Sequence, residues 1–162
     1  MRRREHGFTL IELLVVVALV GVLSAIAAAV LLRARISGNE ASAIGSLRTI
    51  LSGQADYFAF NGGYGNSLTA LSDTCPGVTV PFVSVDLAAN GTAKSGYVFS
   101  VVPGLGATPG QVDLCGNPVS SGFYATAEPI APGFTGNRGF AADTALTLWQ
   151  DRTGVPPIQP FT

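Results

Sequence analysis

Glu12 is the residue whose position most suggests chemistry, because it stands at the start of a long apolar segment. From Leu13 to Leu32 the chain has twenty consecutive residues without a charge. A carboxylate near the start of a membrane span is penalised by roughly 2–3 kcal/mol, so such a residue is a candidate for a functional role. A simple membrane anchor that tolerates one acid near the interface is the plainer alternative.

The side chains needed for catalysis are scarce. The only histidine is His6, beside the N-terminal arginines, and removal of this segment would exclude Ser-His and Cys-His catalysis in their usual forms and any zinc site containing histidine. The distal carboxylates lack the spacing of an EF-hand, which predicts solvated loop acids and leaves open only a calcium site built from distant loops. They are Asp73, Asp86, Asp113, Glu128, Asp143 and Asp151. We therefore predict no enzyme activity, no cofactor and no metal.

Two cysteines, Cys75 and Cys115, lie in the distal part of the chain. An even number of cysteines beside an export-type N-terminus favours a disulfide over two free thiols. The bond would close a loop of 39 intervening residues. By the chain-entropy model a loop of this size stabilises the fold by roughly 3–4 kcal/mol.

The N-terminal segment has the charge asymmetry of a membrane protein. Arg2, Arg3 and Arg4 precede the apolar run and would stay in the cytoplasm by the positive-inside rule. Twenty helical residues at about 1.5 Å each span roughly the 30 Å of a bilayer core. An ordinary signal peptide has a shorter apolar stretch of about 7–15 residues before a small-residue cleavage site, so we expect a membrane-spanning helix.

The contiguous run Gly7-Phe8-Thr9-Leu10-Ile11-Glu12-Leu13-Leu14 resembles the class III signal of type IV pilins and type II secretion pseudopilins. The resemblance implies that residues 1–7 are a leader that a prepilin peptidase cleaves between Gly7 and Phe8, and that Phe8 is then N-methylated. It also implies that Glu12 faces the N-terminal amine of a neighbouring subunit during filament assembly. A carboxylate and an ammonium are each costly alone in a low-dielectric bundle, whereas together they are neutral.

Gly21 corresponds in this resemblance to the glycine that weakens the helix of many pilins, which implies a site of helix flexibility. The proline often found beyond it is missing, since alanines occupy residues 27–29. A close-packing point between helices is the alternative for Gly21.

The helix is expected to continue as an amphipathic segment over residues 33–60, after a transmembrane and filament-core segment over residues 8–32. Arg33 and Arg35 suit the headgroup region. Glu40 and Gln54 interrupt the apolar stripe, and Gly38-Asn39 either breaks the helix or is absorbed as a bend, which we favour. One face carries the apolar residues Ile36, Ala43, Ile44, Leu47, Ile50, Leu51 and Phe58.

Residues 61–162 are predicted to form a globular head. Three glycines and two asparagines in residues 61–66 end the helix, and residues 67–71 suit one short helical turn. Asn90-Gly91-Thr92 matches a glycosylation acceptor, but a turn is the better interpretation. Strand signals occupy residues 97–102, 123–128, 138–142 and 145–149. The predicted fold is α+β, with a long N-terminal helix packed on an antiparallel β-sheet of about four strands.

Aromatic residues gather where the helix is predicted to end. They are Tyr57, Phe58, Phe60 and Tyr64. Aromatic side chains that cap a helix beneath a sheet are most often core residues, so we expect a buried cluster.

The amino-acid composition restricts the possible classes of function further. The chain is 48% hydrophobic and 12% charged, against roughly 25% charged in a soluble domain, which disfavours disorder and points to a membrane or polymer interface. The net charge is −1 and the basic residues after the leader are scattered, so no nucleic-acid partner is predicted.

The resemblance implies a structural subunit of a type IV pilus-like extracellular filament, held in the bacterial inner membrane as a precursor. The implied partners are other copies in a homo-oligomeric helical filament, prepilin peptidase/methyltransferase, an inner-membrane assembly platform with its ATPase, and membrane lipid before assembly. A pseudopilin of a type II secretion system is the first alternative. The second alternative is a membrane-tethered binding module. This function would not explain why an acidic residue stands at position 12.

Overall fold

The computed structural model describes residues 7–161, and the chain divides between Arg35 and Ile36 into two compact units. One helix, α1 (Leu10–Asn61), contributes to both units. It begins at Leu10, two residues after the predicted start, and it continues through Gly38 and Asn39 without a break. The helical continuity predicted for this glycine-containing stretch is therefore confirmed.

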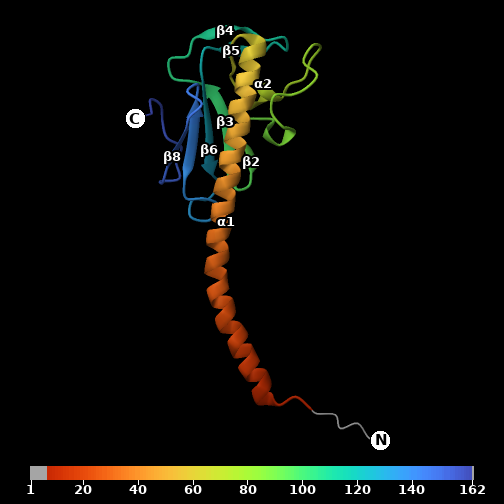
Figure 1. The fold of residues 1–162 in the computed structure, drawn as a ribbon, viewed down its shortest axis with the longest axis vertical. Coiled ribbons are helices and arrows are strands. Elements are labelled where there is room, and N and C mark those ends of the chain that lie inside the picture. Colours follow the sequence, from red (N-terminus) through yellow and green to blue (C-terminus); the bar gives the residue numbers. More distant parts are fainter. Residues whose placement is uncertain (1–6, 162) are drawn as a thin grey trace, which may run out of the picture. The chain divides into compact units, whose positions relative to one another are not determined.

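A five-stranded antiparallel sheet forms the centre of the second unit (Figure 1). Its strands in spatial order are β2 (Thr92–Lys94), β3 (Tyr97–Pro103), β6 (Phe123–Pro129), β7 (Gly139–Asp143) and β8 (Leu148–Asp151). The α+β class is confirmed, and the strand count exceeds the expectation by the short edge strand β2. This strand pairs with β3 through a turn at Ser95 and Gly96, both of which have positive φ.

A second, smaller sheet lies where the sequence predicted only connections. It has the order β1-β5-β4 and consists of β1 (Tyr64–Gly65), β4 (Pro109–Val112) and β5 (Pro118–Ser120). Two short helical elements, α2 (Leu68–Ser72) and η1 (Val85–Leu87), complete the unit. The predicted helical turn over residues 67–71 is α2, which begins one residue later, and the Ser67 hydroxyl caps it by accepting a hydrogen bond from the Ala70 N–H at 3.1 Å.

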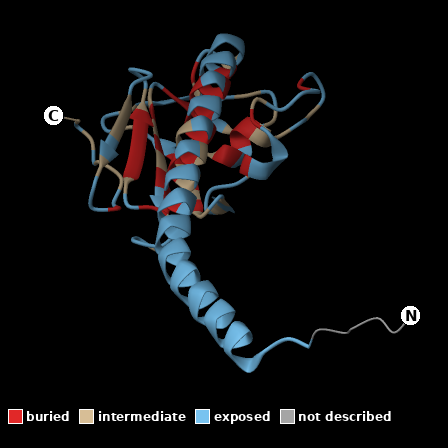
Figure 2. Cartoon of the chain, turned by 60° about the horizontal axis from the view of Figure 1, so that its bottom comes forward, coloured by how far each residue is buried: buried red, intermediate tan, exposed pale blue. Residues whose placement is uncertain are grey.

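The core forms where one face of α1 meets the five-stranded sheet (Figure 2). Leu47 and Ile50 from the helix are fully buried with Phe99, Phe123 and Phe140 from the strands. Burying large aromatic and aliphatic side chains of this kind stabilises a fold by about 1.5–3 kcal/mol each. The helical stripe and the strand faces thus cover each other's apolar surface.

The aromatic cluster at the end of α1 is only partly buried. Tyr57 is 1% exposed, but Phe58 and Phe60 are 43% and 54% exposed, so the core prediction is wrong for these two. Phe58 packs on Tyr64 with ring centroids 4.7 Å apart, while Phe60 lies 6.2 Å from Phe82. Phe58 and Phe60 each pack on one aromatic ring, and the rest of each side chain is exposed to solvent.

The two polar residues that interrupt the apolar stripe anchor the helix to the head. Gln54 is fully buried, and its side-chain amide donates to the Gly65 carbonyl at 2.8 Å and accepts from the Gly65 N–H at 2.9 Å. Glu40 is 5% exposed and accepts hydrogen bonds from the Asn137 N–H at 2.9 Å and from Arg138 Nε at 2.8 Å. Both residues are satisfied, as buried polar groups must be.

Replacing Glu40 by glutamine should destabilise the head. Glu40→Gln keeps the side-chain shape but removes the charge that Arg138 faces, and a hydrogen bond to a charged group contributes about 1.5–3 kcal/mol. Urea unfolding of the chain in detergent, followed by Trp149 fluorescence, measures the loss. Glu128→Gln, at an exposed position on β6, is the matched control, and equal stability of the two variants would contradict the anchoring role.

The free energy of unfolding should also decrease at acidic pH, because Glu40 becomes protonated. Burial alone raises the pKa of Glu40, but hydrogen bonds from Arg138 and Asn137 outweigh it and hold the pKa below its ordinary 4.5. The unfolded chain therefore binds this proton more readily, so the stabilisation present above pH 4.5 is lost as pH falls through the folded-state pKa. Unfolding midpoints measured from neutral pH down to about pH 3 should fall less steeply in Glu40→Gln than in the wild type.

Candidate functional site

The predicted cleavage site lies in exposed, non-helical chain just before α1. Gly7 and Phe8 are both exposed and precede the first helical residue. Exposed peptide bonds outside regular structure are the ones that proteases cut most readily. The cut between Gly7 and Phe8 and the methylation of Phe8 remain predictions, and leader residues 1–6 lie outside the described residues.

Thr9 and Glu12 form a reciprocal cap at the start of α1. The Thr9 carbonyl accepts the first helical hydrogen bond, from the Leu13 N–H. The Thr9 hydroxyl accepts from the Glu12 N–H at 3.3 Å, and Glu12 Oε2 accepts from the Thr9 hydroxyl at 3.1 Å and the Thr9 N–H at 3.4 Å. This is a capping box, and its T-x-x-E signature at Thr9–Glu12 is the local sequence signal from which the cap can be predicted.

The cap gives Glu12 a partner within its own chain. Its carboxylate satisfies a backbone N–H that the first helical turn would otherwise leave open. The carboxylate is nevertheless exposed, so it is accessible to a second partner. The assembly role of Glu12 remains a prediction, and capping is now a specific alternative to it.

The apolar segment after Glu12 is uncovered along its whole length (Figure 2). Among the described residues, one helix is long and apolar enough to cross a membrane, and its most hydrophobic window has a mean hydropathy of 2.9 with none of it buried. Gly21 lies in this segment, and a Cβ atom added there would meet no other atom within 4 Å. The proposed flexibility at Gly21 is untested.

Cys75 and Cys115 form the predicted disulfide, with their Cα atoms 5.6 Å apart. The bond joins the chain after α2 to the β4–β5 connection. Asp113 organises the same connection, because its Oδ1 accepts from the Cys115 N–H at 2.9 Å and from the Asn117 N–H at 2.7 Å. The disulfide is therefore embedded in a structured turn.

Asp113 is not the solvated loop acid that the sequence predicted. Its Oδ2 accepts a hydrogen bond from the Tyr57 hydroxyl at 2.7 Å, which connects the disulfide loop to α1. Burial raises the pKa of Asp113, but the hydrogen bonds from Tyr57 and Asn117 outweigh it and leave the pKa lowered. Burial and the neighbouring Asp113 carboxylate raise the pKa of Tyr57 in turn. The pair is thus held as phenol and carboxylate.

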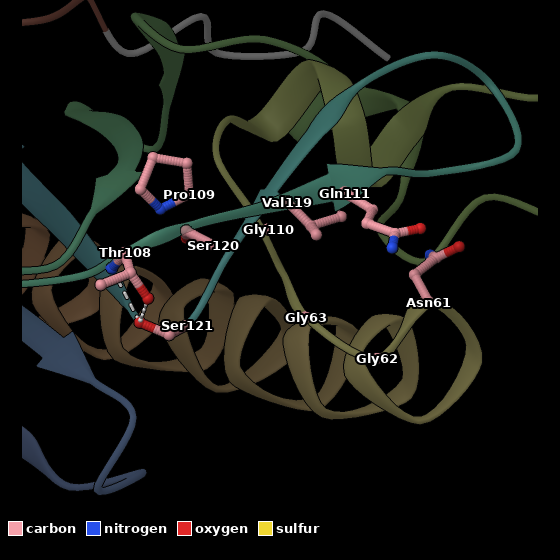
Figure 3. A pocket seen from close by; sticks show the side chains of 10 residues that line it. All are labelled: Asn61, Gly62, Gly63, Thr108, Pro109, Gly110, Gln111, Val119, Ser120 and Ser121. Carbon is pink, nitrogen blue, oxygen red and sulfur yellow. Dashed lines mark hydrogen bonds between the residues drawn. The ribbon is translucent and has the colours of Figure 1, made fainter.

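A pocket of about 350 Å³ lies between the end of α1 and the small sheet (Figure 3). It is lined by Asn61, Gly62, Gly63, Thr108, Pro109, Gly110, Gln111, Val119, Ser120 and Ser121. Thr108 and Ser121 are hydrogen-bonded to each other, with the Thr108 N–H donating to the Ser121 hydroxyl at 2.9 Å. None of these ten lining residues is acidic or basic, so the pocket supplies no general acid or base.

Metal ligands are also dispersed. Within residues 7–161, no three histidine, cysteine, aspartate or glutamate residues lie close enough together to hold a metal ion. The calcium site that the sequence analysis left open therefore has no preformed ligand cluster in this part of the chain.

Removing the disulfide should weaken the head substantially. Replacing both Cys75 and Cys115 by alanine releases a loop with a sequence separation of 40, and the chain-entropy model assigns a loop of this size about 4 kcal/mol. Urea unfolding of the double variant in detergent measures the change. The control is the wild type under reducing conditions, which should match the double variant, and an unchanged midpoint in both would contradict a stabilising bond.

Comparison with known proteins supports the interpretation of the N-terminus alone. Residues 2–28 match the family model described as the prokaryotic N-terminal methylation motif. No curated protein sequence and no solved structure matches the chain. Together with the capped, uncovered apolar helix, this match shows that the chain carries at its N-terminus the class III signal of type IV pilins and pseudopilins.

Proposed function

We propose that the chain is the precursor of a structural subunit of a type IV pilus-like extracellular filament. The observation that carries the proposal is the methylation motif at residues 2–28, which extends into α1, a helix whose apolar first part is wholly exposed. Such a surface requires a cover, which lipid supplies before assembly and neighbouring helices supply afterwards. Prepilin peptidase, which cuts before Phe8, is the partner that the motif implies.

The head is suited to a structural role. α1 continues from the apolar segment into the core of the second unit, so a single helix links the membrane or filament core to the folded domain. Its anchors at Glu40 and Gln54 are buried, and the disulfide fixes the loops at the other end of the head. A subunit built in this way transmits load through one continuous element.

Glu12 is the residue proposed to direct assembly. After cleavage the new amine of Phe8 is a charge that must enter a low-dielectric bundle of helices, and the carboxylate of a neighbouring subunit can neutralise it there. The capping box offers the carboxylate a resting partner before that step. On this proposal Glu12 exchanges an interaction within its own chain for one between subunits.

Two variants separate the charge of Glu12 from its capping role. Glu12→Gln keeps the capping box, because glutamine also serves at this position, but loses the charge. Thr9→Ala loses the cap and keeps the charge, at a cost of about 1 kcal/mol in helix stability. We expect Glu12→Gln to lower the yield of sheared surface filaments at least about tenfold, which corresponds to 1.4 kcal/mol per subunit contact, and Thr9→Ala to retain most of it.

Intact-mass analysis of the sheared and membrane fractions completes the experiment. A mature mass that begins at methylated Phe8 in both variants would show that processing is unaffected and that the defect lies in assembly. Equal filament yields from Glu12→Gln and the wild type would reject the charge-pairing mechanism. A processed wild-type chain that never reaches surface fibres would favour the pseudopilin, and an unprocessed chain confined to the membrane would favour the tethered module.

A further inference from the structure

Two Asn-Gly pairs stand in the head, Asn61-Gly62 and Asn90-Gly91. Glycine has no Cβ atom, so its backbone nitrogen can approach the side-chain amide carbon of a preceding asparagine with little steric hindrance. Gly62 has a φ of 69° and Gly91 a φ of 86°, so both lie in the left-handed region. Because the local sequence and backbone are alike, a difference in reactivity between the two pairs must come from the contacts around them.

The second pair is held by its surroundings. Asn90 Nδ2 donates to the Val101 carbonyl at 2.7 Å, and Asn90 Oδ1 accepts from the Val101 and Leu68 N–H groups at 3.0 Å each. The Gly91 N–H donates to the Phe99 carbonyl at 2.8 Å. Four hydrogen bonds therefore restrain the atoms of this pair, although both residues are exposed.

The first pair is held by less. Asn61 is the last residue of α1, and the Gly62 N–H donates to the Phe58 carbonyl at 2.8 Å. The Asn61 side chain is half-buried and lines the pocket of about 350 Å³, where it lies beside Gln111 (Figure 3). Figure 3 marks no hydrogen bond between the Asn61 amide and the other lining residues.

The number of bonds that must open differs accordingly. For the Gly62 nitrogen to reach the Asn61 side chain, the one hydrogen bond to Phe58 must break, and it lies at a helix end, where local opening is easiest. The same approach at Asn90 requires the loss of four hydrogen bonds, each of which contributes to the stability of the closed state. The less exposed pair is thus the less restrained one.

We propose that Asn61 is a site of spontaneous deamidation and that the fold protects Asn90 from the same reaction. The Gly62 nitrogen loses its proton to water and forms a bond to Asn61 Cγ, while the Cγ–Nδ2 bond breaks and ammonia leaves. Water then opens the cyclic imide at either of its two carbonyl carbons, which gives aspartate or isoaspartate without any change of oxidation state. The proposal goes beyond the proposed function and needs neither membrane insertion nor filament assembly.

The product would change the electrostatics of the pocket. None of the ten lining residues is charged, and the last turn of α1 contains no basic residue. A new carboxylate at position 61 therefore has no cationic neighbour on this turn, and it stands at the end of the helix where the dipole disfavours negative charge. Deamidation thus gives the head a negative charge that accumulates with time after synthesis.

Peptide mapping of the full chain in detergent tests the proposal. Samples are incubated at mildly alkaline pH, either folded or unfolded in urea, and are digested with chymotrypsin at intervals. Cleavage after aromatic residues releases residues 61–64 and 83–97, each with a single asparagine. Mass spectrometry then follows the replacement of the amide by a carboxyl group, and the variant Asn61→Asp supplies the reference peptide for the aspartate product.

We expect Asn61 to deamidate at least about tenfold faster than Asn90 in the folded chain, which corresponds to 1.4 kcal/mol in the free energy of opening. In urea the two peptides should react at comparable rates, because the restraining contacts are lost. Equal rates in the folded chain, or a faster reaction at Asn90, would overturn the proposal. A difference that persists in urea would also overturn it, since the local sequence and not the fold would then be its cause.

Discussion

The surface of α1 between Leu10 and Leu32 imposes the constraint on which the other features depend. All of its side chains are exposed. Water is an unfavourable environment for this much apolar area, so the segment needs lipid or other helices around it. Glu12 and the cap at Thr9 mark the polar end of that segment, while Arg33 and Arg35 mark the other end.

The same helix meets a different requirement after Ile36. There it buries one face against the five-stranded sheet and leaves the opposite face in solvent. The buried face includes most of the apolar stripe that periodicity predicts, but Phe58 of that stripe is exposed and Tyr57 is buried instead. Glu40 and Gln54 lie within this stripe as satisfied polar groups and specify where the head attaches. A close approach also needs Gly53, since a Cβ there would lie 2.6 Å from the Phe82 carbonyl. Apolar burial holds the helix, and polar contacts fix its register.

Sequence reasoning predicted the elements whose signals are local and long. The signal from Gly7 to Leu14 is one contiguous motif. The long helix and the strands β3, β6, β7 and β8 each carry a residue pattern that can be read from neighbouring residues alone. The small sheet could not be predicted this way, because strands of two to four residues that contain proline and glycine form only when tertiary pairing supplies their partners. Asp113 was missed for a related reason, since Tyr57 reaches it across 56 residues.

The long-range anchors have a consequence for the order of folding. Glu40 is made early in synthesis, yet its partner Arg138 follows 98 residues later. At a synthesis rate of about 5–20 residues per second, the carboxylate waits roughly 5–20 s for its guanidinium. Throughout that interval the helical face with Ala43, Leu47 and Ile50 lacks the complete sheet that covers it in the folded chain, because β7 and β8 follow Arg138. The second half of α1 is therefore made first and is completely covered last, once β7 has joined the sheet.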